Sequence, residues 1–158
     1  MRIDLMGKAH NDEEILDSLR ICDGHRYIVA GGEVIWIGDD GEKTDNPNIT
    51  SIPAYTFSYS DEIHKIVIPD SVTFIGEDAF YNCRGLESVT ISNNVMCIEM
   101  GAFNGCCGLT SITVPSSMTI IEECVFDGCT GLKSVTIPES VTRIGAYAFF
   151  WLFQSKVG

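Results

Sequence analysis

Apolar residues recur every 23 positions through the C-terminal two thirds of this 158-residue chain. Four segments, beginning at residues 63, 86, 109 and 132, align without an insertion. Five columns are apolar in every segment, and in the first segment they are Ile63, Ile66, Ile68, Val72 and Ile75. A sixth column holds only phenylalanine, at Phe80, Phe103, Phe126 and Phe149. Columns that stay in register four times indicate a structural repeat.

Each segment predicts one coil of a solenoid. The S-V-T-I stretch alternates, which predicts a strand with Val and Ile inward and Ser and Thr outward. Prolines at 69, 115 and 138 end that strand, and a shorter alternating piece follows. The G-x-x-A-F-x-x-C stretch then predicts one helical turn that places Phe in the core. Gly85, Gly108 and Gly131 close the coil, where we expect positive φ. Because one coil cannot bury both of its apolar edges, the coils must stack.

The unit L-x-S-V-T-I-P-x-S-V-T-x-I-G-x-x-A-F-x-x-C-x-G resembles the BspA-type leucine-rich repeat, closely over residues 63–150 and degenerately over 49–62. This resemblance implies a leucine-rich-repeat solenoid of mostly β, α/β class: a right-handed stack with a parallel sheet on one face and short helical turns opposite. It also implies a role in adhesion or surface binding. The chain departs from the pattern at Ser92–Asn94, which lack the proline, at Glu99 and Glu122, where Gly is usual, and after Phe149.

The period continues towards the N-terminus in degenerate form. Ile49, Ile52 and Phe57 align with Val72, Ile75 and Phe80, so they predict the second half of an earlier coil. Residues 35–37 predict its strand, but an eight-residue insertion separates the two halves. The insertion falls within residues 38–48, which form an acidic loop.

Ahead of this coil the sequence predicts a cap. Gly31-Gly32 joins two β-prone stretches, which is typical of a hairpin. Asn11 and Glu14 predict the start of a helix that buries Ile15, Leu16, Leu19 and Cys22 and ends at Gly24. We therefore divide the chain into a helix-plus-hairpin cap at 1–34 and a solenoid at 35–158. The solenoid comprises the degenerate coil 35–62 and the regular coils 63–85, 86–108, 109–131 and 132–158.

Net charge and hydropathy limit the classes of partner that the chain is expected to bind. The net charge is −12, and residues 1–62 hold 13 Asp and Glu against 5 Lys and Arg. Such a surface repels phosphate backbones, so nucleic acid is not expected. No apolar run reaches the roughly 20 residues of a membrane helix, so membrane insertion is not expected either. The chain as written carries no signal peptide and indicates a cytoplasmic protein, whereas the resemblance implies a secreted or cell-surface one.

Candidate chemistry is sparse. Of seven cysteines, Cys83, Cys106 and Cys129 lie 23 apart and predict a core column of free thiols, with Cys107 facing elsewhere. Cys22-x-x-His25 has zinc-like spacing without a second pair. The acidic stretch 38–46 does not match a calcium loop. We expect no catalytic residue, metal or cofactor.

The remaining candidate site is the outward face of the predicted sheet. It consists of two rows: Lys65, Ser88, Ser111 and Ser134, and Val67, Thr90, Thr113 and Thr136. These rows favour a non-catalytic binding module for a protein ligand, acting in protein–protein interaction or adhesion. Threonine also suits exposed strands without any ligand. An intracellular scaffold or regulator is the alternative function, and an enzyme with its site in the cap is a third.

The C-terminal stretch Phe150-Trp151-Leu152-Phe153 stays apolar but has no next coil to pack on. It predicts either a cap folded over the last coil or a homodimer formed through Phe150, Trp151 and Phe153.

Overall fold

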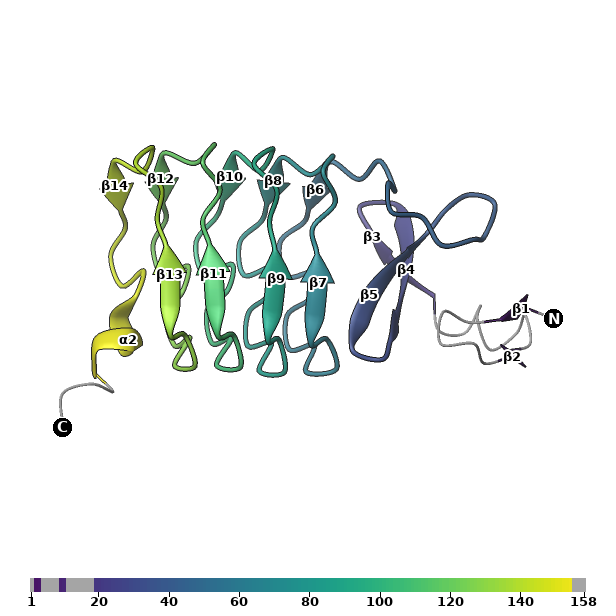
Figure 1. The fold of residues 1–158 in the computed structure, drawn as a ribbon, viewed down its shortest axis with the longest axis horizontal. Helices are drawn as coiled ribbons and strands as arrows, with labels where there is room; N and C mark the ends of the chain where they lie inside the picture. The colour runs from purple at the N-terminus through teal and green to yellow at the C-terminus, as the bar shows by residue number, and fades with distance from the viewer. Residues whose placement is uncertain (1, 4–8, 11–18, 155–158) are drawn as a thin grey trace.

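A row of stacked coils makes up most of the molecule in the computed structural model, which describes residues 2–3, 9–10 and 19–154 (Figure 1). One layer holds three-residue strands that face the viewer in Figure 1: β7 (Lys65–Val67), β9 (Ser88–Thr90), β11 (Ser111–Thr113) and β13 (Ser134–Thr136). A second layer holds two-residue strands: β6 (Ser51–Ile52), β8 (Phe74–Ile75), β10 (Cys97–Ile98), β12 (Ile120–Ile121) and β14 (Arg143–Ile144).

The strand register follows the 23-residue period. Ile66 pairs with Val89 and Ile112 with Val135, both in parallel. In the second layer Ile75 pairs with Ile52 on one side and with Ile98 on the other. Each partner is one period away in sequence, so residues that are 23 positions apart lie side by side in neighbouring coils. The predicted solenoid is confirmed, including the degenerate coil half that contains Ile52.

The apolar columns form one continuous core. Ile52, Ile75, Ile98 and Ile121 are at most 2% exposed. The phenylalanine column is a stack of nearly parallel rings that runs Phe57–Phe80–Phe103–Phe126–Phe149, with centroids 5.0, 5.0, 5.8 and 5.4 Å apart. Four of these rings, Phe57, Phe80, Phe103 and Phe126, are at most 1% exposed, so the stack removes a large aromatic surface from water, which favours folding.

The predicted helical turns opposite the sheet are wrong in detail: these segments are hydrogen-bonded turns. In the first regular coil Asp78 and Asn82 both have positive φ, at 51° and 55°. The equivalent positions one period on are Gly101 and Gly105, with φ of 67° and 76°. A left-handed residue every fourth position prevents an α-helix from propagating. In the last coil Trp151 occupies the position of Asn82, the second left-handed residue of the first regular coil. The described helix, α2 (Phe150–Gln154), forms at this position.

Gly85, Gly108 and Gly131 close each coil, but the prediction of positive φ there is wrong. Their need for glycine is steric. A Cβ on Gly85 would lie 2.1 Å from the carbonyl oxygen of Asp61, and one on Gly131 would lie 2.3 Å from that of Cys107. Glycine therefore lets each coil approach the backbone of the preceding one.

Two hairpins precede the first coil. β4 (His25–Ala30) and β5 (Glu33–Ile37) pair antiparallel across Gly31-Gly32, as predicted, and both glycines have positive φ. β3 (Arg20–Cys22) pairs with β4 across Asp23-Gly24, whose φ values of 49° and 76° suit the same tight turn. Cys22 therefore lies in a strand, so its predicted place at the end of a helix is wrong. Asp-Gly is a hairpin signal, which outweighed the helical spacing.

The rest of the cap is only partly described. β1 (Arg2–Ile3) and β2 (Ala9–His10) form a short antiparallel pair. The helix predicted to start at Asn11 falls on residues 11–18, outside the described residues. The division of the chain at residues 34 and 35 stays a prediction, since β5 crosses it and also joins the solenoid sheet through Glu33 and Lys65.

The acidic insertion, residues 38–48, is largely exposed. It is anchored to the hairpin by the Thr44 N–H, which donates to the Trp36 carbonyl at 3.0 Å, and by Arg26, which donates to the Gly38 carbonyl at 2.6 Å. Pro47 is buried at its end. The insertion thus extends the edge of β5.

The cysteine column is a ladder of buried thiols, as predicted. Cys83, Cys106 and Cys129 are free and fully buried, and each thiol donates to the carbonyl of a phenylalanine in the preceding coil. Burial raises the pKa of Cys129 to about 12. These thiols remain protonated and apolar in the core.

We expect a thiol-specific reagent to label three cysteines in the folded protein. Cys107 is exposed and should react first, followed by Cys97 and Cys124, which are partly exposed and whose pKa values burial raises. Absorbance titration with an aromatic disulfide at neutral pH measures this, and the denatured chain, with all seven thiols labelled, is the control. Rapid labelling of more than three in the folded state would contradict the buried ladder.

Candidate protein-binding surface

The outward rows of the first sheet layer lie together on one exposed face. The face comprises the residues at both ends of each three-residue strand: Lys65, Val67, Ser88, Thr90, Ser111, Thr113, Ser134 and Thr136. All eight are exposed, and Val67 is 53% exposed. The middle residue of each strand turns inward to the core. This alternation places the predicted site residues on one face, which we call the sheet face.

The sheet face differs in charge from the rest of the molecule. Lys65 is its one charged residue, and the Lys65 ammonium lies 3.5 Å from the Glu33 carboxylate across the junction with the cap. The other members are hydroxyl residues and one valine. On a chain of net charge −12 this face is close to neutral. Its hydroxyls both donate and accept hydrogen bonds, so it can contact a polar protein surface.

A groove lies at the N-terminal end of the sheet face, between β5 and β7. β5 and β7 pair only at Glu33 and Lys65 and then diverge (Figure 1). The space between them has a volume of about 290 Å³. Its walls come from both strands and from the acidic insertion: Glu33, Val34, Ile35, Trp36, Lys43, Thr44, Asp45, Lys65 and Val67. The groove joins Lys65 and Val67 of the sheet face to the cap.

Both sheet layers are interrupted at one junction, between coils 86–108 and 109–131. β9 pairs with β7 and β11 pairs with β13, while β9 and β11 form no ladder with each other. β10 and β12 are likewise unpaired. The widest step in the phenylalanine stack, 5.8 Å between Phe103 and Phe126, lies at this junction. The stack is therefore looser here than at its neighbours.

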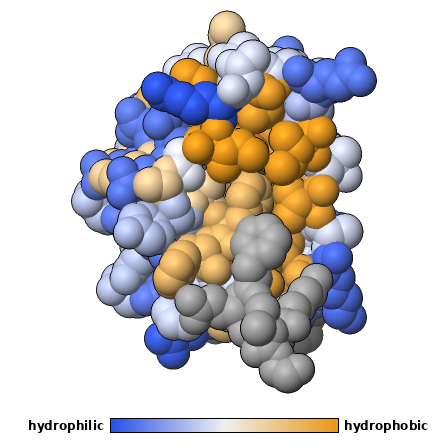
Figure 2. Space-filling view, turned by 90° about the vertical axis from the view of Figure 1, so that its left-hand side faces the viewer, coloured by the Kyte–Doolittle hydropathy of each residue, from blue (hydrophilic) through white to orange (hydrophobic). Residues whose placement is uncertain are grey.

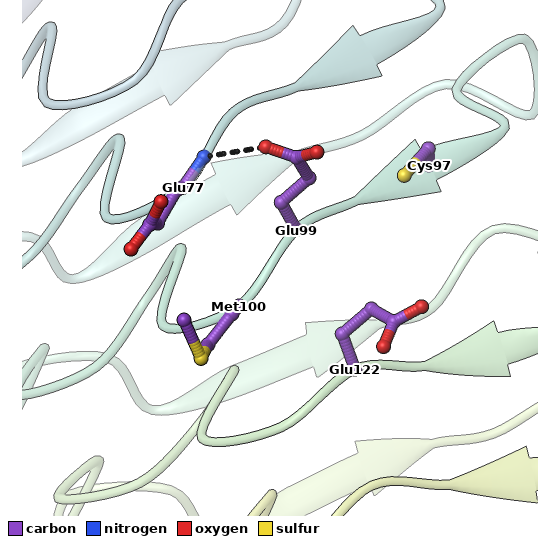
Figure 3. Close-up of a pocket in the computed structure, with 5 residues that line it drawn as sticks. All are labelled: Glu77, Cys97, Glu99, Met100 and Glu122. Atoms are coloured by element: carbon purple, nitrogen blue, oxygen red, sulfur yellow. Dashed lines mark hydrogen bonds between the residues drawn. The ribbon is translucent and has the colours of Figure 1, made fainter.

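An acidic pocket of about 290 Å³ opens beside the same junction. It is lined by Glu77, Cys97, Glu99, Met100 and Glu122 (Figure 3). One Glu99 carboxylate oxygen accepts the Glu77 backbone N–H at 3.1 Å. Burial raises the pKa of the Cys97 thiol, and the carboxylates of Glu99 and Glu122 raise it further. The pocket therefore disfavours a thiolate.

The two departures from glycine both line this pocket. Gly76 and Gly145 occupy the same position in their coils, and a Cβ on either would lie 2.5 Å from a backbone nitrogen of the preceding coil. Glu99 and Glu122 carry that Cβ. The Glu99 coil keeps the usual spacing, since the Glu99 N–H donates to the Ile75 carbonyl at 2.9 Å and Phe80 lies 5.0 Å from Phe103. The Glu122 coil is the one whose strands are unpaired with those of the coil before it. The sequence shows both substitutions, but the pocket that they line was not predicted.

The structure offers no metal-binding cluster in the part of the chain whose side chains it describes. Cys22 and His25 face each other across the β3–β4 hairpin, with Cys22 buried in the core. Over the same described residues no helix is both long and apolar enough to cross a membrane.

Comparison with known proteins agrees with this architecture. The family model for the BspA type leucine rich repeat region, with six copies, matches residues 50–154. The chain belongs to this family. Leucine-rich repeats of this kind are typically protein-interaction modules and are generally not enzymes. No curated protein matches the sequence.

Solved structures of bacterial leucine-rich repeat proteins are similar to this chain. A leucine-rich repeat protein from Bacteroides ovatus is 33% identical, with a TM-score of 0.59 over 63% of this chain and 26% of its own. One from Bacteroides capillosus is 24% identical, with a TM-score of 0.52 over 75% of this chain and 97% of its own. A leucine rich cell surface protein from Faecalibacterium prausnitzii is 22% identical, with a TM-score of 0.48 over 76% and 39%. The chain thus spans about a quarter of the B. ovatus protein.

Proposed function

We propose that this protein is a non-catalytic module that binds a protein ligand through the sheet face and the adjoining groove. The observation that carries the proposal is the alignment of eight exposed side chains in two rows along four strands of the first sheet layer, β7 with β9 and β11 with β13. Because a buried core holds each strand, the rows are pre-organised and lose little entropy on binding. Solenoids generally use such extended faces for recognition.

The chemistry of the sheet face favours a polar ligand surface. Seven of the eight side chains end in a hydroxyl or an ammonium, and Val67 adds an apolar contact beside the groove. A face that lacks large aromatic anchors predicts modest affinity for one module. Adhesion proteins compensate for modest affinity with multiple contacts. We therefore propose adhesion at a cell surface, in keeping with the family resemblance, as the setting of this binding.

A panel of purified extracellular proteins on an array tests this function. We expect Thr90→Arg/Thr113→Arg to abolish specific signals, because two long cations in the second row block close approach to the sheet face. Both residues are exposed, so the folded state should tolerate the changes.

The matched control is Thr73→Arg/Thr119→Arg, which places the same two arginines at exposed positions beside the second sheet layer. This control should retain every signal that the unmodified protein gives. Signals that survive in the sheet-face variant, or that disappear equally in the control, would contradict binding through the sheet face.

A further inference from the structure

The last coil presents an apolar end face. In every earlier coil the equivalent face is covered by the next coil. Ile137 is 42% exposed and Ile144 is 51% exposed, whereas their equivalents one period earlier, Val114 and Ile121, are 3% and 1% exposed. Figure 2 shows the apolar residues gathered in a continuous area on this end of the molecule. The exposure therefore marks the surface against which another layer would pack.

Helix α2 leaves this end face open. A groove of about 260 Å³ remains beside β13, lined mainly by apolar side chains that include Leu132, Val135, Phe149 and Leu152. On α2 itself Phe150 is 39% exposed and Trp151 is 47% exposed. The tail thus adds apolar surface to the end face.

The backbone at this end is open as well. β13 pairs with β11 and β14 pairs with β12, and among the described strands neither has a partner on its outer side. Exposed strand edges of this kind are templates for pairing with another chain.

The opposite end of the molecule is closed. The β4–β5 hairpin packs on the first coil, and the Tyr27 ring meets Phe57 edge-on with centroids 5.3 Å apart. The hairpin occupies the place where a further coil would stack, so this end offers no bare coil for head-to-tail stacking of a second copy. A closed pair that uses the same face of both copies is compatible with both ends.

Charge also favours a second copy at the end face. Between residues 132 and 152 the charged side chains are Lys133, Glu139 and Arg143, which sum to +1, against −12 for the chain. Two copies therefore meet at their least acidic ends. The acidic N-terminal regions then lie at the two far ends of the pair, where their mutual repulsion is weakest.

We propose that the end face, defined by Ile137, Ile144, Phe149, Trp151 and the edge of β13, binds the same face of a second copy in an isologous dimer. This surface adjoins the sheet face at β13 and does not include the rows on β7, β9 and β11, so the dimer presents two sheet faces and doubles the number of ligand contacts.

Size-exclusion chromatography with light scattering tests the dimer across a concentration series. We expect the mass to rise from 17.3 kDa and to level off at twice that value. Ile144→Lys should raise the dimer dissociation constant at least about tenfold, because it buries a charge without a partner. Trp151→Ser, at the exposed face of α2, should weaken the dimer in the same direction without touching a sheet.

Ile21→Lys is the matched control, since Ile21 is 69% exposed in β3 at the other end of the molecule. It should leave the dissociation constant unchanged. A 17.3 kDa mass at all concentrations, a mass that grows beyond two copies, or equal weakening by Ile21→Lys would each overturn the proposal.

Discussion

Phe103→Ala is expected to lower the free energy of unfolding by about 3–5 kcal/mol, the usual cost of emptying a buried aromatic site. Phe103 is 0% exposed. Its ring stacks on Phe80 at 5.0 Å and on Phe126 at 5.8 Å, with the planes within 8° of parallel. Truncation removes contacts to both neighbouring coils. The step from Phe103 to Phe126 lies at the junction where neither sheet layer is continuous, so the backbone hydrogen bonds there come from the turns, such as the one from the Phe103 N–H to the Val125 carbonyl at 3.0 Å.

Chemical denaturation followed by far-ultraviolet circular dichroism measures this loss. Phe150→Ala is the control, because Phe150 has the same side chain but lies in α2, outside the phenylalanine column, and is 39% exposed. It should cost less than about 1 kcal/mol. A Phe103→Ala loss that is no larger than the control would show that the phenylalanine column does not hold the coils together.

The sequence predicts the stack of coils almost completely, because each coil repeats the previous one at a fixed step along the solenoid axis. Once Ile52, Ile75, Ile98 and Ile121 are aligned by the period, their pairing as parallel neighbours follows. The buried thiols of Cys83 and its equivalents follow in the same way. Hydrophobic period is a strong signal when it is repeated without insertion.

Backbone conformation was less predictable. Glycine at 85, 108 and 131 suggested positive φ, but the structure uses glycine there for close approach between coils. Left-handed residues occur instead at Asp78 and Asn82, where the residue type gives only a weak indication. The pattern of side chains defines which face is buried, and it leaves the local dihedral angles open.

For the candidate site, the rows of the sheet face could be predicted and its surroundings could not. Alternation alone places Thr90 and Thr113 outward. The groove depends on how far β5 diverges from β7, and the acidic pocket depends on how neighbouring coils place the side chains of Glu77, Glu99 and Glu122. Both are tertiary adjustments, which a one-dimensional pattern does not contain.

A second large effect is expected for Gly131→Ala, which should cost about 2–3 kcal/mol through overpacking. The new Cβ would lie 2.3 Å from the carbonyl oxygen of Cys107 and 3.1 Å from that of Leu109. Both are backbone atoms of the preceding turn, so no side chain can rotate away. The coil that begins at Leu132 would have to move outward and lengthen its hydrogen bonds, including the one from the Lys133 N–H to the Thr110 carbonyl, now 2.9 Å.

Gly38→Ala separates this steric effect from the general cost of replacing glycine. Gly38 also has ordinary φ, but the nearest atom to its new Cβ is a carboxylate oxygen of Asp40, at 3.0 Å on a side chain that can move. We expect its unfolding free energy to stay within about 0.5 kcal/mol of the parent protein. If both variants unfold at the same denaturant concentration, glycine in the repeat does not serve close packing of the coils. If only Gly131→Ala unfolds early, and hydrogen exchange speeds up first in residues 132–154, the distance between successive backbones limits the stability of the stack.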